Sequence, residues 1–128
     1  MTYHISKTIA DTLDGAVEKV TAALQEEGFG VLTDIDVQAT LKKKIGADFR
    51  GYRILGSCNP HFAHQALKSE DRIGTMLPCN VIVQERDGGI VEVSAVDPMA
   101  SMQAIENSTL EVIASEVRQR LTRVIGTL

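Results

Sequence analysis

Alternation of apolar and polar residues marks five stretches of the chain as β-strands. Each has a period of two, which places alternate side chains on opposite faces of an extended strand. The stretches span 3–9, 29–37, 52–57, 81–86 and 90–96. Asp87-Gly88-Gly89 separates the last two stretches, and this turn composition predicts a β-hairpin.

Strand 29–37 carries two carboxylates on its polar side. The alternation places Val31 and Ile35 on one face and Asp34 and Asp36 on the other. Paired carboxylates can hold a hard metal ion. We nevertheless favour an exposed polar face, because strands covered on one side commonly carry polar residues on the other.

A period of 3.6 residues marks two long helices, one near each end of the chain. The first follows Asp11, which we expect to cap it, and ends at Gly28, a residue that accepts a left-handed backbone. The second begins at Ser108, whose spacing from Glu111 is that of a capping box, and ends at Gly126.

Shorter helices are predicted at three places. One spans 38–45. Another begins at Pro60 with Asn59 as its cap, because proline suits the first helical position. A helical turn begins at Pro98 with Asp97 as its cap, and a carboxylate near a binding site would be an additional role for Asp97.

The element order, with short helices set aside, is β-α-β-β-β-β-α. It predicts an α+β fold: an antiparallel sheet of about five strands with two long helices packed on one face. Residues 1–128 fit one domain of ordinary size. The open edges and the second sheet face would need cover, so we expect a homodimer.

Composition limits the partners of the protein. A net charge of -4 at pH 7 argues against nucleic acid, because phosphate binding depends on Lys and Arg. The run Lys42-Lys43-Lys44 is an exception that we interpret as a solvated face. We see no signal peptide and no apolar run approaching the roughly 20 residues that span a membrane. We therefore expect a cytoplasmic protein with reduced cysteines that binds neither membrane nor nucleic acid.

The stretch 56–80 concentrates the reactive side chains. It contains Cys58-Asn59-Pro60 and Pro78-Cys79-Asn80, the same three residue types in different order, together with His61 and His64. If the third and fourth strands are antiparallel, Cys58 and Cys79 lie at the same end of the sheet. The candidate site residues are Cys58, Asn59, His61, His64, Cys79, Asn80 and Asp97.

Three segments resemble an uncharacterised family known as domain of unknown function 302. They are Leu55-Gly56-Ser57-Cys58-Asn59-Pro60, Leu77-Pro78-Cys79-Asn80-Val81-Ile82-Val83 and Ala95-Val96-Asp97-Pro98-Met99. The resemblance extends over roughly residues 15–128. It implies an α+β fold related to the TATA-binding-protein-like architecture, and homodimers. It implies little about function, because that fold serves both DNA-binding and ligand-binding proteins.

We favour a small-molecule or ion binding module over an enzyme. Asn59 and Asn80, each held by a nearby proline, would present amide donors and acceptors at the end of the sheet. Phe62 and the methionines would supply an apolar lining. The cofactor, if there is one, is unknown.

Thiol chemistry is the first alternative. In a thiol-dependent redox enzyme, Cys58 would be the nucleophile, activated by the positive end of the following helix. His61 or His64 would be the base, and Cys79 the resolving thiol. The same residues could bind a soft metal such as zinc or copper, although the paired Cys-x-x-Cys of zinc sites is missing.

A structural or interaction protein without a small-molecule site is the second alternative. In that case Cys58 and Cys79 are small buried hydrophobes. Asn59 and Asn80 then serve as a cap and a turn residue, roles in which asparagine is common for backbone reasons alone.

Overall fold

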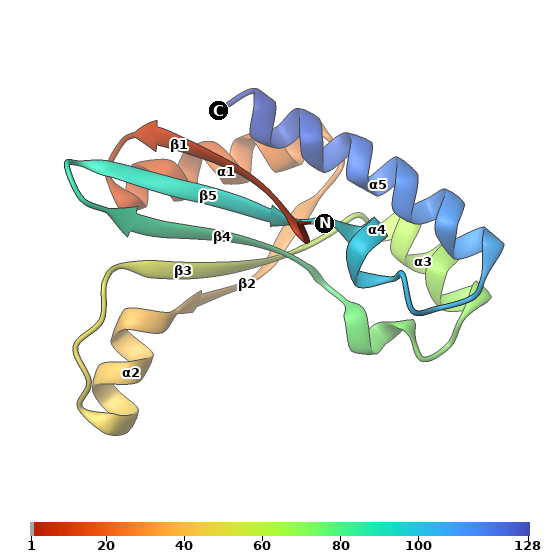
Figure 1. The fold of residues 1–128 in the computed structure, drawn as a ribbon, viewed down its shortest axis with the longest axis horizontal. Helices are drawn as coiled ribbons and strands as arrows, with labels where there is room; N and C mark the ends of the chain where they lie inside the picture. Colours follow the sequence, from red (N-terminus) through yellow and green to blue (C-terminus); the bar gives the residue numbers. More distant parts are fainter. Residues whose placement is uncertain (1) are drawn as a thin grey trace.

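A computed structural model describes residues 2–128 as an open sheet flanked by helices (Figure 1). The strands and long helices follow one another along the chain in the predicted order. The elements are β1 His4–Ala10, α1 Leu13–Glu26, β2 Gly30–Asp36, α2 Val37–Ile45, β3 Tyr52–Cys58, α3 Pro60–Ser69, the 3₁₀ turn η1 Ile73–Met76, β4 Cys79–Arg86, β5 Ile90–Val96, α4 Pro98–Ser101 and α5 Ser108–Gly126.

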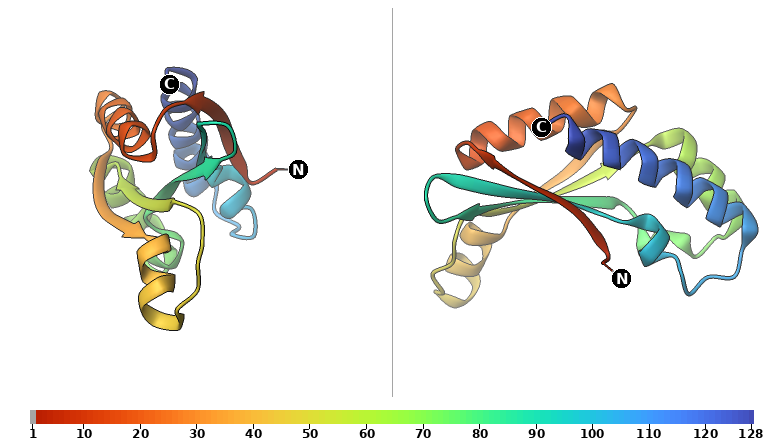
Figure 2. Two further views of the ribbon diagram at one scale, coloured as in Figure 1. Left: turned by 90° about the vertical axis from the view of Figure 1, so that its left-hand side faces the viewer. Right: turned by 45° about the horizontal axis from the view of Figure 1, so that its top comes forward.

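The five strands lie in the order β1-β5-β4-β3-β2, and every neighbouring pair is antiparallel. The two long helices, α1 and α5, cover one face of this sheet (Figure 2). Both parts of the α+β prediction are therefore confirmed. None of the helices within residues 2–128 is long and apolar enough to cross a membrane.

The core lies between the sheet and the two long helices. Alternate residues of the central strands point toward the helices and are buried, as the period of two predicts. The stripes on α1 and α5 pack against them. The largest fully buried side chains are Val20, Leu24, Leu55, Ile73, Val81, Val83, Val91, Val93, Pro98, Leu110, Leu121 and Val124.

A β-bulge in β2 overturns the predicted faces of that strand. The register shifts between Val31 and Thr33, so Val31 lies opposite Ser57 and Asp34 lies opposite Leu55. An inserted residue reverses the alternation beyond it. Asp34 therefore shares a face with Val31 and pairs with Arg53, whose Nε donates to Asp34 Oδ1 at 2.8 Å.

Asp36 does not join Asp34 in a metal site. Its side chain caps α2, where Oδ1 accepts a hydrogen bond from the backbone N–H of Ala39 at 2.9 Å. Ile35, which we expected on the same face as Val31, lies on the face away from the long helices and is 47% exposed.

The long helices begin at residues other than the predicted caps. Thr12, not Asp11, caps α1, and its Oγ1 accepts from Gly15 N at 3.0 Å. Asn107, not Ser108, caps α5. In both cases the predicted cap is one residue from the actual one, because several short polar residues there can satisfy the free N–H groups. Gly28, with φ of 85°, follows α1 in the left-handed conformation expected of it.

The Asp87-Gly88-Gly89 turn joins β4 to β5 as predicted. Arg86 pairs with Ile90, so the loop has three residues, and two of them, Gly88 and Gly89, have positive φ of 82° and 74°, which glycine adopts most readily. The outer strand β1 pairs with β5, and the Nζ of Lys7 on β1 donates to the backbone oxygen of Leu128. The strands β4, β5 and β1 are thus three consecutive neighbours at one edge of the sheet.

Candidate small-molecule site

A cavity of about 250 Å³ lies where the ends of β3 and β4 meet α3, α4 and α5. Its walls come from segments far apart in the sequence. The residues that line it are Phe29, Leu32, Ser57, Cys58, Asn59, Phe62, Ala63, Ala66, Leu67, Leu77, Pro78, Cys79, Pro98, Met102, Ile113, Ala114 and Val117.

The cavity lining is almost wholly apolar and carries no formal charge among the residues that the structure describes. Four of its members have polar groups: the hydroxyl of Ser57, the thiols of Cys58 and Cys79, and the amide of Asn59. The cavity is not sealed from solvent, since two of its lining residues, Leu32 and Leu67, are 68% and 42% exposed. An apolar molecule could therefore enter without unfolding the core.

The two cysteines lie at the same end of the sheet, as predicted. β3 ends at Cys58 and β4 begins at Cys79, which lies beside Ser57 in the antiparallel register. Both thiols are free, and both border the cavity. Burial, with a smaller contribution from nearby Cys58, raises the pKa of the Cys79 thiol to about 11. Cys79 is therefore protonated at neutral pH.

Asn59 precedes α3 but does not cap it. Its side chain makes no hydrogen bond to the first turn of α3 within the described chain, which corrects the capping role that we predicted. The residue is 7% exposed, and its Nδ2 donates to the backbone oxygen of Glu27 at 3.4 Å. Arg120 Nη1 donates to the same oxygen at 3.1 Å. The buried amide thus belongs to the cavity wall and to the end of α1.

The histidines and Asn80 lie outside the cavity. His61 and His64 are exposed on α3. Asn80 is exposed and pairs in register with Gly56, so it points to the opposite sheet face from Cys79. A shift of one residue along a strand reverses the side-chain direction, which is why Cys79 and Asn80 separate. The structure does not bring these three side chains to the two thiols.

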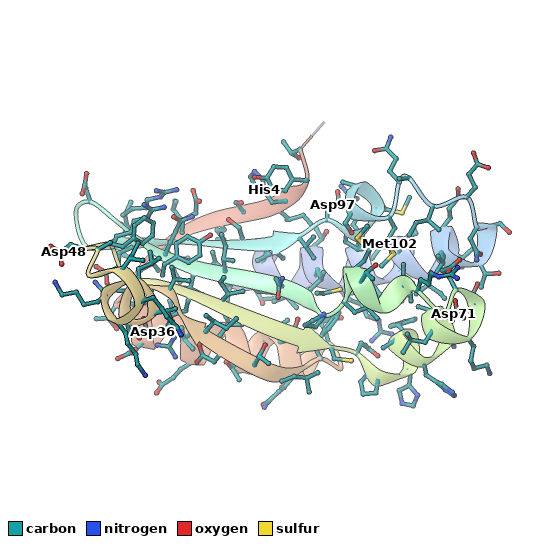
Figure 3. The ribbon with its side chains drawn as sticks, turned by 90° about the horizontal axis from the view of Figure 1, so that it is seen from below. His4, Asp36, Asp48, Asp71, Asp97 and Met102 are labelled. Carbon is teal, nitrogen blue, oxygen red and sulfur yellow. The ribbon has the colours of Figure 1, made fainter. Side chains whose placement is uncertain are left out.

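Asp97 does not line the cavity, but it stabilises the position of α4 beside it. Its Oδ1 accepts from Met99 N at 3.0 Å and caps α4, as predicted. Its Oδ2 accepts from Arg118 Nε at 3.0 Å, which ties α4 to α5. Figure 3 shows Asp97 and Met102 near each other, at the end of the molecule opposite Asp36 and Asp48.

Comparison with known proteins places the chain in a family. The model of the domain of unknown function DUF302 matches residues 5–128. The chain belongs to that family. No curated protein matches it. A crystal structure of an uncharacterized conserved protein DUF302 from Bacillus stearothermophilus is similar to it, with 27% sequence identity and a TM-score of 0.91 over 98% of each chain.

The three segments through which this DUF302 chain resembles its family meet at the cavity. The first contributes Ser57, Cys58 and Asn59. The second contributes Leu77, Pro78 and Cys79, and the third contributes Pro98. The strand order brings them together because β3, β4 and β5 are neighbours in the sheet.

The donor set of the DUF302 chain does not form a metal centre. Within residues 2–128, no three His, Cys, Asp or Glu side chains lie close enough together to hold an ion. A structural zinc site needs about four ligands, which this part of the chain does not bring together.

The candidate residues that we chose from the sequence include few of the residues that line the cavity. Ala63 and Ala66 on α3 and Ala114 and Val117 on α5 belong to ordinary amphipathic stripes. Their small size leaves room between the two helices. That size was a signal, but alanine in a helix has many causes, since it is the best helix former.

Proposed function

We propose that the protein is a binding module for a small, mainly apolar molecule held in the cavity between α3, α5 and the ends of β3 and β4. The observation that carries this proposal is a cavity of about 250 Å³ whose lining has no charged residue within the described chain. Apolar pockets with a few polar groups are the usual form of small-molecule sites.

The volume indicates the size of the ligand. An apolar cavity of roughly 150 Å³ stays dry and binds benzene, whereas sites for drug-sized molecules begin at about 300 Å³. At about 250 Å³ this cavity matches a molecule of two fused rings or a short branched chain. Leu32 and Leu67, the exposed leucines of the lining, would contact it from the solvent side.

A titration with naphthalene tests the proposal. The chain has no Trp, so naphthalene fluorescence can be followed against a low protein background. We expect saturable binding with a stoichiometry of one per chain. The Ala114→Leu variant should abolish it by filling the cavity, whereas Ala22→Leu, at an exposed position of α1, should leave it unchanged. Failure of the wild type to bind naphthalene or similar apolar molecules would refute the proposal.

A thiol-dependent redox enzyme is the second candidate, supported by the position of Cys58 and Cys79 on one cavity. Two observations weaken it. The pKa of Cys79 is about 11, so little thiolate is present at neutral pH. His61 and His64, the bases that we considered, are exposed on α3 and do not line the cavity. Iodoacetamide modification of Cys58 at pH 7 no faster than that of free cysteine would eliminate this candidate.

We also propose that the protein is a homodimer that covers the sheet face away from α1 and α5. Ile35, Ile54 and Ile82 lie in register across β2, β3 and β4 on that face, where α2 borders only one end (Figure 1). A second copy would bury this apolar row symmetrically. Sedimentation equilibrium should give a dimer for the wild type and a monomer for Ile35→Lys. Val112→Lys, exposed on α5, is the control and should remain a dimer.

A further inference from the structure

We infer that the ligand is uncharged and carries one hydrogen-bond donor, such as a hydroxyl group, which the side-chain oxygen of Asn59 accepts. This inference rests on the proposed binding function and adds the chemical class of the ligand to it. It follows from the charges around the cavity and from the hydrogen bonds of four polar groups.

The surroundings of the cavity exclude an ion. No Asp, Glu, Lys, Arg or His of the described residues lines it. The flanking cations are already paired: Arg118 Nε donates to Asp97, and Arg120 donates to Glu116 through Nε and to the Glu27 backbone oxygen through Nη1. An ion entering the cavity would lose water without gaining an opposite charge, so its binding is disfavoured.

The orientation of the Asn59 amide is fixed by its neighbour. The oxygen of Glu27 is a hydrogen-bond acceptor only, so the NH₂ group of Asn59, not its oxygen, faces it at 3.4 Å. No donor within residues 2–128 bonds to Asn59 Oδ1. This oxygen keeps some accessible surface, although the residue as a whole is only 7% exposed. Because Asn59 lines the cavity, a ligand there can supply the hydrogen bond that the protein does not.

The other polar groups of the lining cannot replace Asn59. The hydroxyl of Ser57 donates to the Cys79 backbone oxygen at 2.8 Å, and the residue is 0% exposed, so its oxygen offers no accessible surface to a ligand. Cys58 and Cys79 are free cysteines, and a thiol is a weak donor and a weak acceptor. Asn59 Oδ1 is therefore the strongest free acceptor on the cavity wall, and its complement on a ligand is a neutral O–H or N–H donor.

Three related molecules test the inference at pH 7: naphthalene, 2-naphthol and the 2-naphthoate anion. In the wild type we expect 2-naphthol to bind about fivefold to tenfold more tightly than naphthalene, the gain of one buried hydrogen bond. We expect 2-naphthoate to bind far more weakly than either, because its carboxylate would be buried without a partner. Fluorescence titration measures all three affinities.

The Asn59→Leu variant separates the hydrogen bond from the apolar contribution. It should keep the affinity for naphthalene and lose the preference for 2-naphthol. The Glu27 oxygen retains its bond from Arg120, so little stability depends on Asn59. Asn80→Leu is the matched control, because it makes the same substitution at an exposed position on the opposite face of the sheet, outside the cavity, and should preserve the preference. Asn59→Ala replaces the leucine variant if that variant does not fold, and naphthalene binding reports that either variant is folded.

The outcomes distinguish the two proposals. If the wild type binds none of the three molecules, the binding function itself is wrong. If naphthalene and 2-naphthol bind equally well, or if the Asn59 variants retain the preference, the function stands and the role of Asn59 is wrong. Tight binding of 2-naphthoate would refute the uncharged ligand class while leaving the cavity as a binding site.

Discussion

Filling the cavity should stabilise the protein while preventing binding. Ala114 lies on α5, is buried and borders the cavity. Replacing it with leucine adds three carbon atoms that point into unfilled space. Because alanine and leucine are both good helix formers, the substitution changes packing with little effect on helix propensity.

The expected gain follows from the burial of those carbons. Each buried methylene contributes about 0.8 kcal/mol, so three contribute roughly 2.4 kcal/mol. Ordering a leucine side chain costs about 0.5–1 kcal/mol of rotamer entropy. The net increase in the free energy of unfolding is therefore about 1.5 kcal/mol, and the cavity of about 250 Å³ is large enough to take the added atoms without displacing its walls.

Urea denaturation measures this gain. The Ala114→Leu variant should raise the midpoint with no change in the slope m, because the surface exposed on unfolding hardly changes. Ala22→Leu, which adds the same atoms at an exposed position of α1, should shift the midpoint little. Destabilisation of Ala114→Leu by about 1–3 kcal/mol is the signature of an overpacked core. That result would refute the reasoning, since it would mean that the space is closed in solution.

Three further predictions concern the groups around the site and the sheet. At pH 8, iodoacetamide should label Cys58 much faster than Cys79, whose labelling should rise only as the pH approaches its pKa of about 11; peptide mass spectrometry checks this. The hydrogen bond with Arg53 lowers the pKa of Asp34 in the folded protein. This pair therefore stabilises the fold fully at pH values above the unfolded pKa of about 3.9, and the stabilisation is lost as the pH falls through the lower pKa of the folded state. Arg53→Gln should therefore reduce the acid dependence of the urea midpoint. Asp97→Ala should cost about 1–2 kcal/mol by removing the α4 cap and the Arg118 pair, and Asp97→Asn should cost less because it keeps an acceptor for the cap.

Each of these predictions has an outcome that would contradict it. Equal labelling of Cys58 and Cys79 at pH 8 would mean that Cys79 is not buried in solution. An unchanged acid profile for Arg53→Gln would show that the ion pair with Asp34 is absent or fully screened by solvent. Equal stability of Asp97→Ala and the wild type would remove the support that we assign to α4.

Much of the fold was predictable because its signals are local. The period of two in the central strands, the turn at Gly88 and Gly89 and the stripe on α5 each depend on residues close in sequence. The exact helix starts were not predictable, because Asp11 and Thr12 are both acceptable caps and only backbone geometry chooses between them. The bulge at Val31 was not predictable either. The residues around it still alternate between apolar and polar, so the sequence pattern gives no sign of the extra residue.

The candidate site was predictable in place but not in composition. Cys58 and Cys79 are brought together by strand pairing, which follows from the element order. The spacing of His61 and His64 also suits a site, but both histidines are exposed on α3, whereas Phe62 and Ala66 on the same helix line the cavity. Asn59 was expected to cap its own helix and instead bonds to the end of α1, a contact between residues far apart in the sequence.

The sequence by itself therefore determined the elements, their order and the end of the sheet where the cysteines meet. Periodicity and turn chemistry decide those features within a few residues. The tertiary structure alone decided that the same end forms a cavity lined by uncharged residues, Asn59 among them. Its volume depends on how closely α3 and α5 approach, and its charge depends on which face each helix turns inward. Both are set by long-range packing, to which no local pattern corresponds.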